Sequence, residues 1–152
     1  FSLSEVVFER LLYILVVSAL PAYKKAVERT RNAELQLFLN PTIRAVQRAS
    51  YKENPENLTP KEILPFEFTN SSWNEDNTKY ETNMHSITAS CDSGNVCTAL
   101  LSYPAKKNPR YTLKIIAEKD TETKKICIYY QNDFEHICDY MTSYNFTKEK
   151  GN

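Results

Sequence analysis

The stretch that decides the fold comes first in the chain: FSLSEVVFERLLYILVVSALP, residues Phe1 to Pro21. Its apolar side chains fall on nearly every side of a helix drawn through it. One acid, Glu5, nevertheless lies near the amino end. Because a lone carboxylate in apolar surroundings is costly, it either takes a proton or finds a cation. This combination predicts a subunit that is stored in a membrane and packs into a larger assembly.

The helical pattern continues to about Ser50. Beyond Pro21 the apolar residues recur roughly at helical spacing, so the helix becomes amphipathic. These residues are Ala22, Ala26, Val27, Ala33, Leu37, Phe38, Ile43 and Val46. A helix over residues 1–50 would be about 75 Å long at the usual rise per residue. Because ordinary domains use much shorter helices, a helix of this length is expected to serve something beyond its own domain.

Two prolines interrupt this helical pattern. Pro21 and Pro41 lack a backbone N–H, which frees the carbonyl groups of Val17 and Leu37 four residues earlier. We expect each proline to kink the helix. The alternative is that Asn40-Pro41 ends one helix and begins another.

The rest of the chain, 51–152, is expected to form a globular head. Residues 51–84 are rich in Asn, Glu, Thr and Pro and predict a long loop. A short helix is possible within that loop at Thr59-Pro60-Lys61-Glu62-Ile63-Leu64, which has the cap residue, the proline and the acid of a helix start. The tail, 131–152, is polar and is expected to be a further loop.

Residues 85–130 contain four strand-like runs. They are His85–Ser90, Val96–Tyr103, Tyr111–Glu118 and Lys124–Tyr130. Short turn-rich connections between them indicate an antiparallel meander. The fold class is therefore α+β: a long amino-terminal helix packs on a four-stranded antiparallel sheet. We expect this helix to be apolar over residues 1–21 and amphipathic over residues 22–50.

All four cysteines lie in the carboxyl-terminal half of the chain. An even number beside an apolar amino terminus favours disulfides and an oxidising compartment. Of the three possible pairings we prefer Cys91–Cys97 with Cys127–Cys138, because residues 92–96 are typical of a hairpin tip and facing residues of a hairpin lie at disulfide distance. The alternative is a zinc site using His136 with Cys127 and Cys138. Since no C-x-x-C pair is present, we do not favour a metal.

The composition argues against several other kinds of site. Lys plus Arg number 19 and Asp plus Glu number 19, so no field of one sign indicates nucleic acid or an acidic substrate. Glycine occurs only at Gly94 and Gly151, which argues against glycine-rich phosphate loops and leaves turns to Asn, Asp, Ser and Pro. The only histidines, His85 and His136, lie in no nucleophile motif. We expect no enzyme activity, no cofactor and no small-molecule substrate.

The amino-terminal residues resemble a type IV pilin of the N-methylphenylalanine family. The resemblance rests on five features: Phe1, Glu5, the apolar run, the step Ala19-Leu20-Pro21-Ala22-Tyr23, and Lys24-Lys25-Ala26-Val27-Glu28-Arg29. It covers roughly residues 1–35 at motif level. The carboxyl-terminal cysteine pair also resembles the loop that this family closes with a disulfide.

The resemblance implies a structural subunit of an extracellular pilus used in adhesion or motility. Phe1 would be exposed by prepilin peptidase and carry an N-methylated amine. Glu5 would neutralise the amine of a neighbouring subunit in a homopolymer held together by its helices. Before assembly the subunit would reside in the inner membrane, where the pilus assembly machinery takes it up. The chain departs from the family pattern at Glu9-Arg10, which leaves a fully apolar stretch shorter than the roughly 20 residues that span a bilayer.

Two related functions are alternatives to that of a pilus subunit. A pseudopilin of a type II secretion system shares the design but works as a short periplasmic piston, and the two cysteine pairs and the long tail favour a surface pilin over it. A minor pilin with an adhesion or DNA-binding role would use basic and aromatic residues interleaved as in single-strand binders. The candidates for that role are Lys106, Lys107 and Arg110 with Tyr103 and Tyr111.

Overall fold

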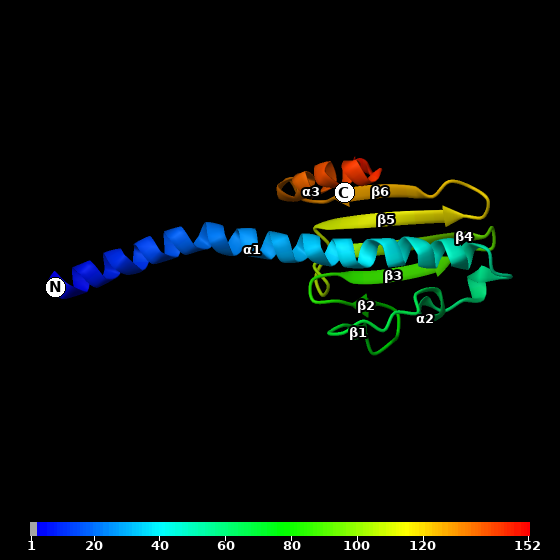
Figure 1. The fold of residues 1–152 in the computed structure, drawn as a ribbon, viewed down its shortest axis with the longest axis horizontal. Helices are drawn as coiled ribbons and strands as arrows, with labels where there is room; N and C mark the ends of the chain where they lie inside the picture. The colour runs from blue at the N-terminus through cyan, green and yellow to red at the C-terminus, as the bar shows by residue number, and fades with distance from the viewer. Residues whose placement is uncertain (1–2) are drawn as a thin grey trace. The chain divides into compact units, whose positions relative to one another are not determined.

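The computed structural model describes residues 3–152, apart from the side chains of Leu3 and Ser18. The prediction for Phe1 therefore lies outside the described residues. The chain divides into two compact units, Phe1–Phe38 and Leu39–Asn152, and the long helix α1 (Leu3–Ser50) runs through the boundary between them (Figure 1). The predicted fold class is confirmed: a long amino-terminal helix accompanies a mostly antiparallel sheet and two disulfides.

Helix α1 contains both prolines without a break. Its 48 residues include Pro21 and Pro41, so the alternative in which one helix ends at Asn40 is wrong. A proline inside a helix removes one backbone hydrogen bond, and the remaining bonds of a helix this long tolerate that loss. Whether either proline kinks the helix stays a prediction.

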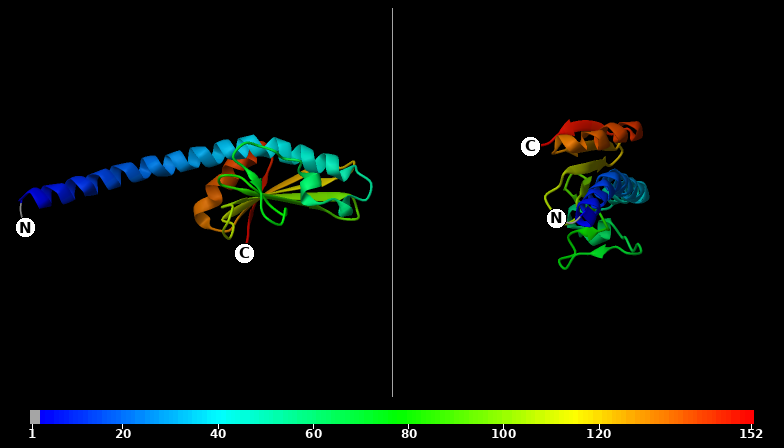
Figure 2. Two further views of the ribbon diagram at one scale, coloured as in Figure 1. Left: turned by 90° about the horizontal axis from the view of Figure 1, so that it is seen from below. Right: turned by 90° about the vertical axis from the view of Figure 1, so that its left-hand side faces the viewer.

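The second unit begins with the last turns of α1, residues 39–50, which lie across one face of the sheet (Figure 2). The buried side chains of these turns recur at helical spacing. They are Leu39, Thr42, Ala45, Val46, Ala49 and Ser50. Two hydrogen bonds tie the end of the helix to turns of the sheet: Gln47 Nε2 donates to Thr123 Oγ1 (2.9 Å), and Asn95 Nδ2 donates to the Ser50 carbonyl (2.8 Å). The second of these satisfies a carbonyl that the helix end leaves without an intrahelical partner.

The sheet has seven strands in chain order, all antiparallel except for the parallel last pair. The strands are β1 (Ser72–Trp73), β2 (Tyr80–Glu81), β3 (Ser86–Cys91), β4 (Val96–Tyr103), β5 (Tyr111–Glu118), β6 (Lys124–Tyr129) and β7 (Thr147–Lys150). The four predicted strands are β3 to β6, each confirmed to within a residue at either end. The prediction of four strands omits β1 and β2, which are too short to show alternation, and β7, which is exposed along its whole length.

One face of the sheet carries the core. The register aligns Ile87, Leu101, Leu113 and Cys127 across β3 to β6, and all four side chains are buried. The next inward row aligns Ala89, Ala99 and Ile115. Residues between these rows point to the opposite face and are more exposed, as period-two alternation requires.

Asparagine and aspartate take the left-handed backbone positions in the turns. The non-glycine residues with positive φ are Asn54, Asn70, Asn77, Asn95, Asp120 and Asn145, and neither glycine has a positive φ. Short polar side chains tolerate this conformation better than other L-residues do. The expectation that turns would rely on residues other than glycine is confirmed.

The tail is more ordered than the predicted loop. It contains α3 (Glu135–Met141), flanked by the short 3-10 helices Asn132–Phe134 and Thr142–Tyr144, and then β7. The Cys127–Cys138 disulfide joins α3 to β6. On the surface, Lys148 Nζ donates to Asp139 Oδ1 and Glu135 Oε1, both at 2.9 Å, and these hydrogen bonds raise the pKa of Lys148 above its ordinary value. The sequence pattern missed α3 because its 7 residues make only about two turns, too few to show a helical period.

The loop between α1 and β1 contains a 3-10 helix, Pro55–Asn57, and the short helix α2 (Pro60–Ile63), which confirms the predicted helix start. Thr59 and Glu62 form a capping box: the Thr59 hydroxyl accepts from the Glu62 N–H, and the Thr59 N–H and hydroxyl donate to the Glu62 carboxylate. These two bonds to the carboxylate, the one from the backbone N–H first, lower the pKa of Glu62 below its ordinary value.

We predict that the two disulfides contribute unequally to stability. Replacing Cys127 and Cys138 together by Ser should lower the free energy of unfolding by about 2–4 kcal/mol, because this bond holds α3 to the sheet and both residues are fully buried. Replacing Cys91 and Cys97 should have a smaller effect, because the β3–β4 hydrogen bonds already hold that hairpin closed. Urea unfolding followed by circular dichroism measures both. The prediction would be contradicted if removal of the Cys91–Cys97 bond lowered the free energy of unfolding as much as, or more than, removal of the Cys127–Cys138 bond.

We predict that Glu62 makes the stability depend on pH at the acid end. Because its pKa is lower in the folded state, the ionised carboxylate stabilises the fold above its ordinary pKa of 4.5, and this contribution is lost as the pH falls through the folded-state value. The melting temperature of the wild type should therefore exceed that of Glu62→Gln at pH 7. This difference in melting temperature should disappear well below pH 4.5. Glu67→Gln, an exposed acid outside the capping box, is the matched control and should show no such difference in thermal melts across the same pH series.

Candidate assembly surface

The candidate functional surface is the apolar segment of α1, residues 6–23. Its large side chains are between 37% and 71% exposed. They are Val6, Val7, Phe8, Leu11, Leu12, Tyr13, Ile14, Leu15, Val16, Val17, Leu20 and Tyr23. Residues 11–23 carry no charge. Monomeric soluble proteins seldom expose a continuous apolar surface of this kind, so the apolar segment indicates packing against partners or a membrane.

The apolar side chains surround the helix instead of forming one stripe. The consecutive residues Leu11 to Val17 are all exposed and all apolar, so they point in every direction around the axis. A helix that is apolar all round is covered on all sides in its working state. A single docking partner on one side would leave half of this surface in water. The pattern therefore favours a helix bundle or a lipid environment.

The helix also meets the length and composition requirements of a membrane span. Ser4–Ser50 contains an 18-residue window that is sufficiently apolar, carries no more than two charges and has no residue buried inside the chain. The helix thus meets these requirements of a membrane span despite Glu9 and Arg10, although its fully apolar run is short. Signal sequences and core helices meet the same requirements, so this finding indicates an apolar environment for the helix.

The charged residues of the segment gather at its amino end. Glu5 lies in the first turn of α1, where a negative charge interacts favourably with the helix dipole. Glu5, Glu9 and Arg10 are all exposed. Covering the surrounding apolar side chains would take these groups out of water, and a charge removed from water needs an opposite charge beside it. The arrangement can therefore fix the axial position of one helix against another.

Amphipathic burial begins further along the helix. Of residues 4–26, every side chain that the structure describes is exposed. From Arg31 onward, buried positions recur at helical spacing: Arg31, Glu34, Leu35 and Phe38. Of the predicted apolar face, Phe38 is buried here, whereas Ala33 and Leu37 are exposed, so the prediction of that face is confirmed only in part. Arg31 also forms an ion pair with Glu28 at 3.6 Å between Nη2 and Oε1. The apolar segment therefore ends before the first buried positions of α1.

The predicted cysteine pairs are both formed. Cys91 bonds to Cys97 across the β3–β4 hairpin, where the register places them directly opposite each other, and Cys127 bonds to Cys138. The alternative zinc site used Cys127 and Cys138 with His136. Because both sulfur atoms are joined in a disulfide, that ligand set does not form. Among residues 3–152 no other group of three or more His, Cys, Asp or Glu side chains is arranged to hold a metal ion.

Of the basic and aromatic residues proposed for a binding tip, all but Tyr111 line a groove of about 570 Å³ between the β2–β3 and β4–β5 turns. Lys106 and Lys107 are exposed there, and Lys106 approaches Glu81 (3.8 Å). Tyr111 is fully buried, stacks on Tyr103 (5.5 Å between ring centroids) and shares a 2.6 Å hydrogen bond with His85 Nε2. The prediction that Tyr111 presents its ring to a ligand is therefore wrong. Alternation along β5 turns this residue into the core.

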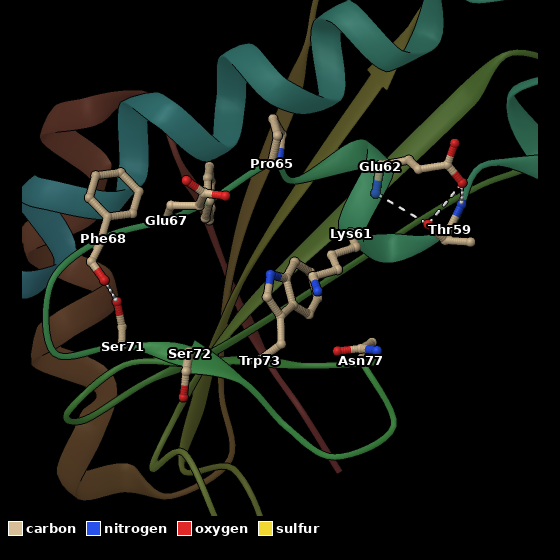
Figure 3. A pocket seen from close by; sticks show the side chains of 11 residues that line it. Thr59, Lys61, Glu62, Pro65, Glu67, Phe68, Ser71, Ser72, Trp73 and Asn77 are labelled. Atoms are coloured by element: carbon tan, nitrogen blue, oxygen red, sulfur yellow. Dashed lines mark hydrogen bonds between the residues drawn. The ribbon is translucent and has the colours of Figure 1, made fainter.

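A second groove lies on the head and was not predicted (Figure 3). This Trp73 groove has a volume of about 880 Å³. It is lined by Thr59, Lys61, Glu62, Pro65, Phe66, Glu67, Phe68, Ser71, Ser72, Trp73 and Asn77. Its walls come from α2, from the segment that follows α2, and from the β1–β2 hairpin. The sequence signal was the lone tryptophan within a polar stretch, but only the folded loop brings these segments together.

Comparisons with protein-family models, with curated proteins and with solved structures find no match to this chain. The likeness to pilins therefore rests on the structure itself: a long, exposed apolar helix at the amino end, an antiparallel sheet, and a carboxyl-terminal region closed by a disulfide. These features are consistent with a pilin-like fold.

We predict that removing residues 1–26 converts the protein into a soluble monomer. The described side chains of residues 4–26 are exposed, so their removal should change the melting temperature by no more than a few degrees. The shortened chain should stay soluble without detergent, whereas the full chain should require it. Size-exclusion chromatography and thermal melts measure both properties. A shortened chain that aggregates or loses its melting transition would contradict the prediction.

Proposed function

We propose that this chain is a structural subunit of an extracellular filament of the type IV pilus kind. The observation that carries the proposal is the apolar segment, residues 6–23 of α1, exposed on all sides in a chain of pilin-like architecture. In the filament the apolar segments of many copies form the interior, and the heads, with their sheets, form the outside. Each segment is then covered by segments of other copies.

Burial of apolar surface supplies the cohesion. If each subunit buries ~1,000 Å² of apolar area in the bundle, the gain is on the order of 25 kcal/mol before the losses of association are subtracted. Even a fraction of this holds a polymer together. Because the hydrophobic effect has no direction, however, it does not determine how far one helix is displaced along the next.

The charged amino end determines that displacement. Glu5 pairs with the amine of Phe1 in a neighbouring copy, and the pair is stable only where the two charges meet. Any other displacement leaves a charge in apolar surroundings without an opposite charge. Glu9 and Arg10, which follow about one turn further on, carry opposite charges and can compensate each other between copies in the same way.

Storage and secretion follow from the same features. The apolar segment holds the subunit in the inner membrane, where prepilin peptidase exposes Phe1 and the amine is methylated. The assembly machinery then transfers the helix from lipid into the bundle, which preserves its apolar surroundings. The two disulfides suit an extracytoplasmic head, since such bonds persist in oxidising compartments. On the cell surface the filament serves adhesion or motility.

We predict that the charge at position 5 controls assembly. Glu5→Lys places a second cation beside the neighbouring amine, and Glu5→Gln leaves that amine buried without an anion, at about 3–5 kcal/mol per subunit. Filament yield should fall by more than about 100-fold in both variants. Electron microscopy and immunoblotting of sheared surface material measure the yield, and the amount of subunit in the membrane should stay unchanged.

Glu122→Gln is the matched control for this experiment, because it removes an exposed acid from the β5–β6 turn of the head and leaves α1 unchanged. It should retain most of the filament yield. An unchanged yield in Glu5→Lys would refute the role of this acid. The filament proposal itself would be refuted if the native protein occurred only as single water-soluble molecules. Confinement of the polymer to the periplasm would instead indicate the pseudopilin function.

A further inference from the structure

The Trp73 groove has a rigid aromatic floor. Trp73 is half-buried, and its ring meets Tyr80 edge to face (centroids 5.5 Å apart, 70° between planes). Tyr80 is almost completely buried and meets Phe66 in the same way at 5.5 Å. The Tyr80 hydroxyl accepts from the Phe68 N–H (2.9 Å) and shares a 2.6 Å hydrogen bond with Ser71 Oγ. Packing and hydrogen bonds thus hold Tyr80 in place, and Tyr80 supports the indole from one side before any ligand arrives.

Polar groups with free hydrogen-bonding capacity surround this floor. Among residues 3–152, the side chains of Lys61, Glu67, Ser72 and Asn77 and the indole N–H of Trp73 have no hydrogen-bond or ion-pair partner. Figure 3 shows Trp73 standing within the groove, with Lys61 and Asn77 beside it in this view. Together these groups offer donors and acceptors around one aromatic ring. They differ in this respect from Thr59 and Glu62, whose side chains are used by the capping box.

The charges of the groove favour a neutral ligand. Lys61 and Glu67 offset each other, and Glu62, already bound to Thr59, adds one negative charge. Nucleic acids and other polyanions would meet no excess of cations here. A purely apolar ligand would leave the polar groups without hydrogen bonds. The suitable ligand therefore has an apolar face for the indole and many hydroxyl groups around its edge.

We propose that the Trp73 groove binds a neutral oligosaccharide. The C–H face of a pyranose ring lies against the indole of Trp73. Its hydroxyl groups exchange hydrogen bonds with Asn77, Glu67 and Lys61. The volume of about 880 Å³ lies within the range of small-molecule sites. The proposal does not depend on filament formation, because every lining residue belongs to the unit Leu39–Asn152.

Trp73 is the single tryptophan of the chain, so its fluorescence reports on this groove alone. The full chain, in a detergent without a sugar headgroup, is titrated with maltotriose, cellotriose, mannotriose and tri-N-acetylchitotriose. We expect at least one of these sugars to shift the emission maximum of Trp73 to shorter wavelength in a saturable way. Asn77→Ala and Glu67→Gln should each weaken that binding by about 3- to 10-fold, the effect of one hydrogen bond. Lys107→Ala, in the other groove, is the matched control and should bind as wild type does.

Three outcomes would overturn the proposal. The first is the absence of a saturable shift with all four sugars. The second is binding that Asn77→Ala and Glu67→Gln leave unchanged; both residues are exposed, so these variants are expected to keep the fold, and thermal melts check this. The third is a Trp73 that iodide cannot quench in the full chain in detergent, because a groove that excludes iodide also excludes sugars.

Discussion

The need to cover the apolar segment of α1 is the constraint on which the rest depends. Residues 6–23 expose large apolar side chains in all directions, and nothing within a single copy covers the described side chains of residues 4–26. Water is an unfavourable surrounding for such a helix, so its stable environments are a lipid bilayer and a bundle of like helices. The two environments are similar enough for one helix to pass between them. In the proposed function, storage in a membrane and assembly into a filament are two uses of one surface.

The carboxyl-terminal turns of the same helix pack in the core of the head. One helix therefore carries both the exposed apolar segment and a part of the folded core. Over residues 39–50, burial is confined to one side of α1, and the sheet beneath presents small residues, Ala89 and Ala99, in the row next to Leu101. Small side chains let a helix approach a sheet closely. The hydrogen bond from Asn95 to the Ser50 carbonyl closes the end of the helix. Because α1 is one continuous helix, its backbone would transmit a load from the apolar segment to the head in the proposed filament.

The head combines a regular scaffold with an irregular margin, which is the loop that contains α2 together with the β1–β2 hairpin. The disulfides and the long central strands hold the scaffold, while the loop of α2 and the short β1–β2 hairpin form the margin in which the Trp73 groove lies. Loops positioned by a rigid sheet are where binding sites commonly occur. In the proposed filament the heads face outward, which leaves such a margin available to molecules outside the cell. Cohesion and recognition then involve different regions of the chain.

Local patterns were enough to predict the long helix, the four central strands, the cap at Thr59 and both disulfides, because each depends on neighbours in sequence or across a hairpin. The sequence alone did not predict β7, which pairs in parallel with β6 through groups distant along the chain. The sequence analysis also proposed Tyr111 as a binding residue, although its side chain is buried. The aromatic character of a residue does not show which face of its strand points into the core. The Trp73 groove was decided only by the tertiary structure, because its walls come from segments that are polar, short and irregular. Periodicity identifies elements that bury a face, whereas a groove arises where separate elements meet.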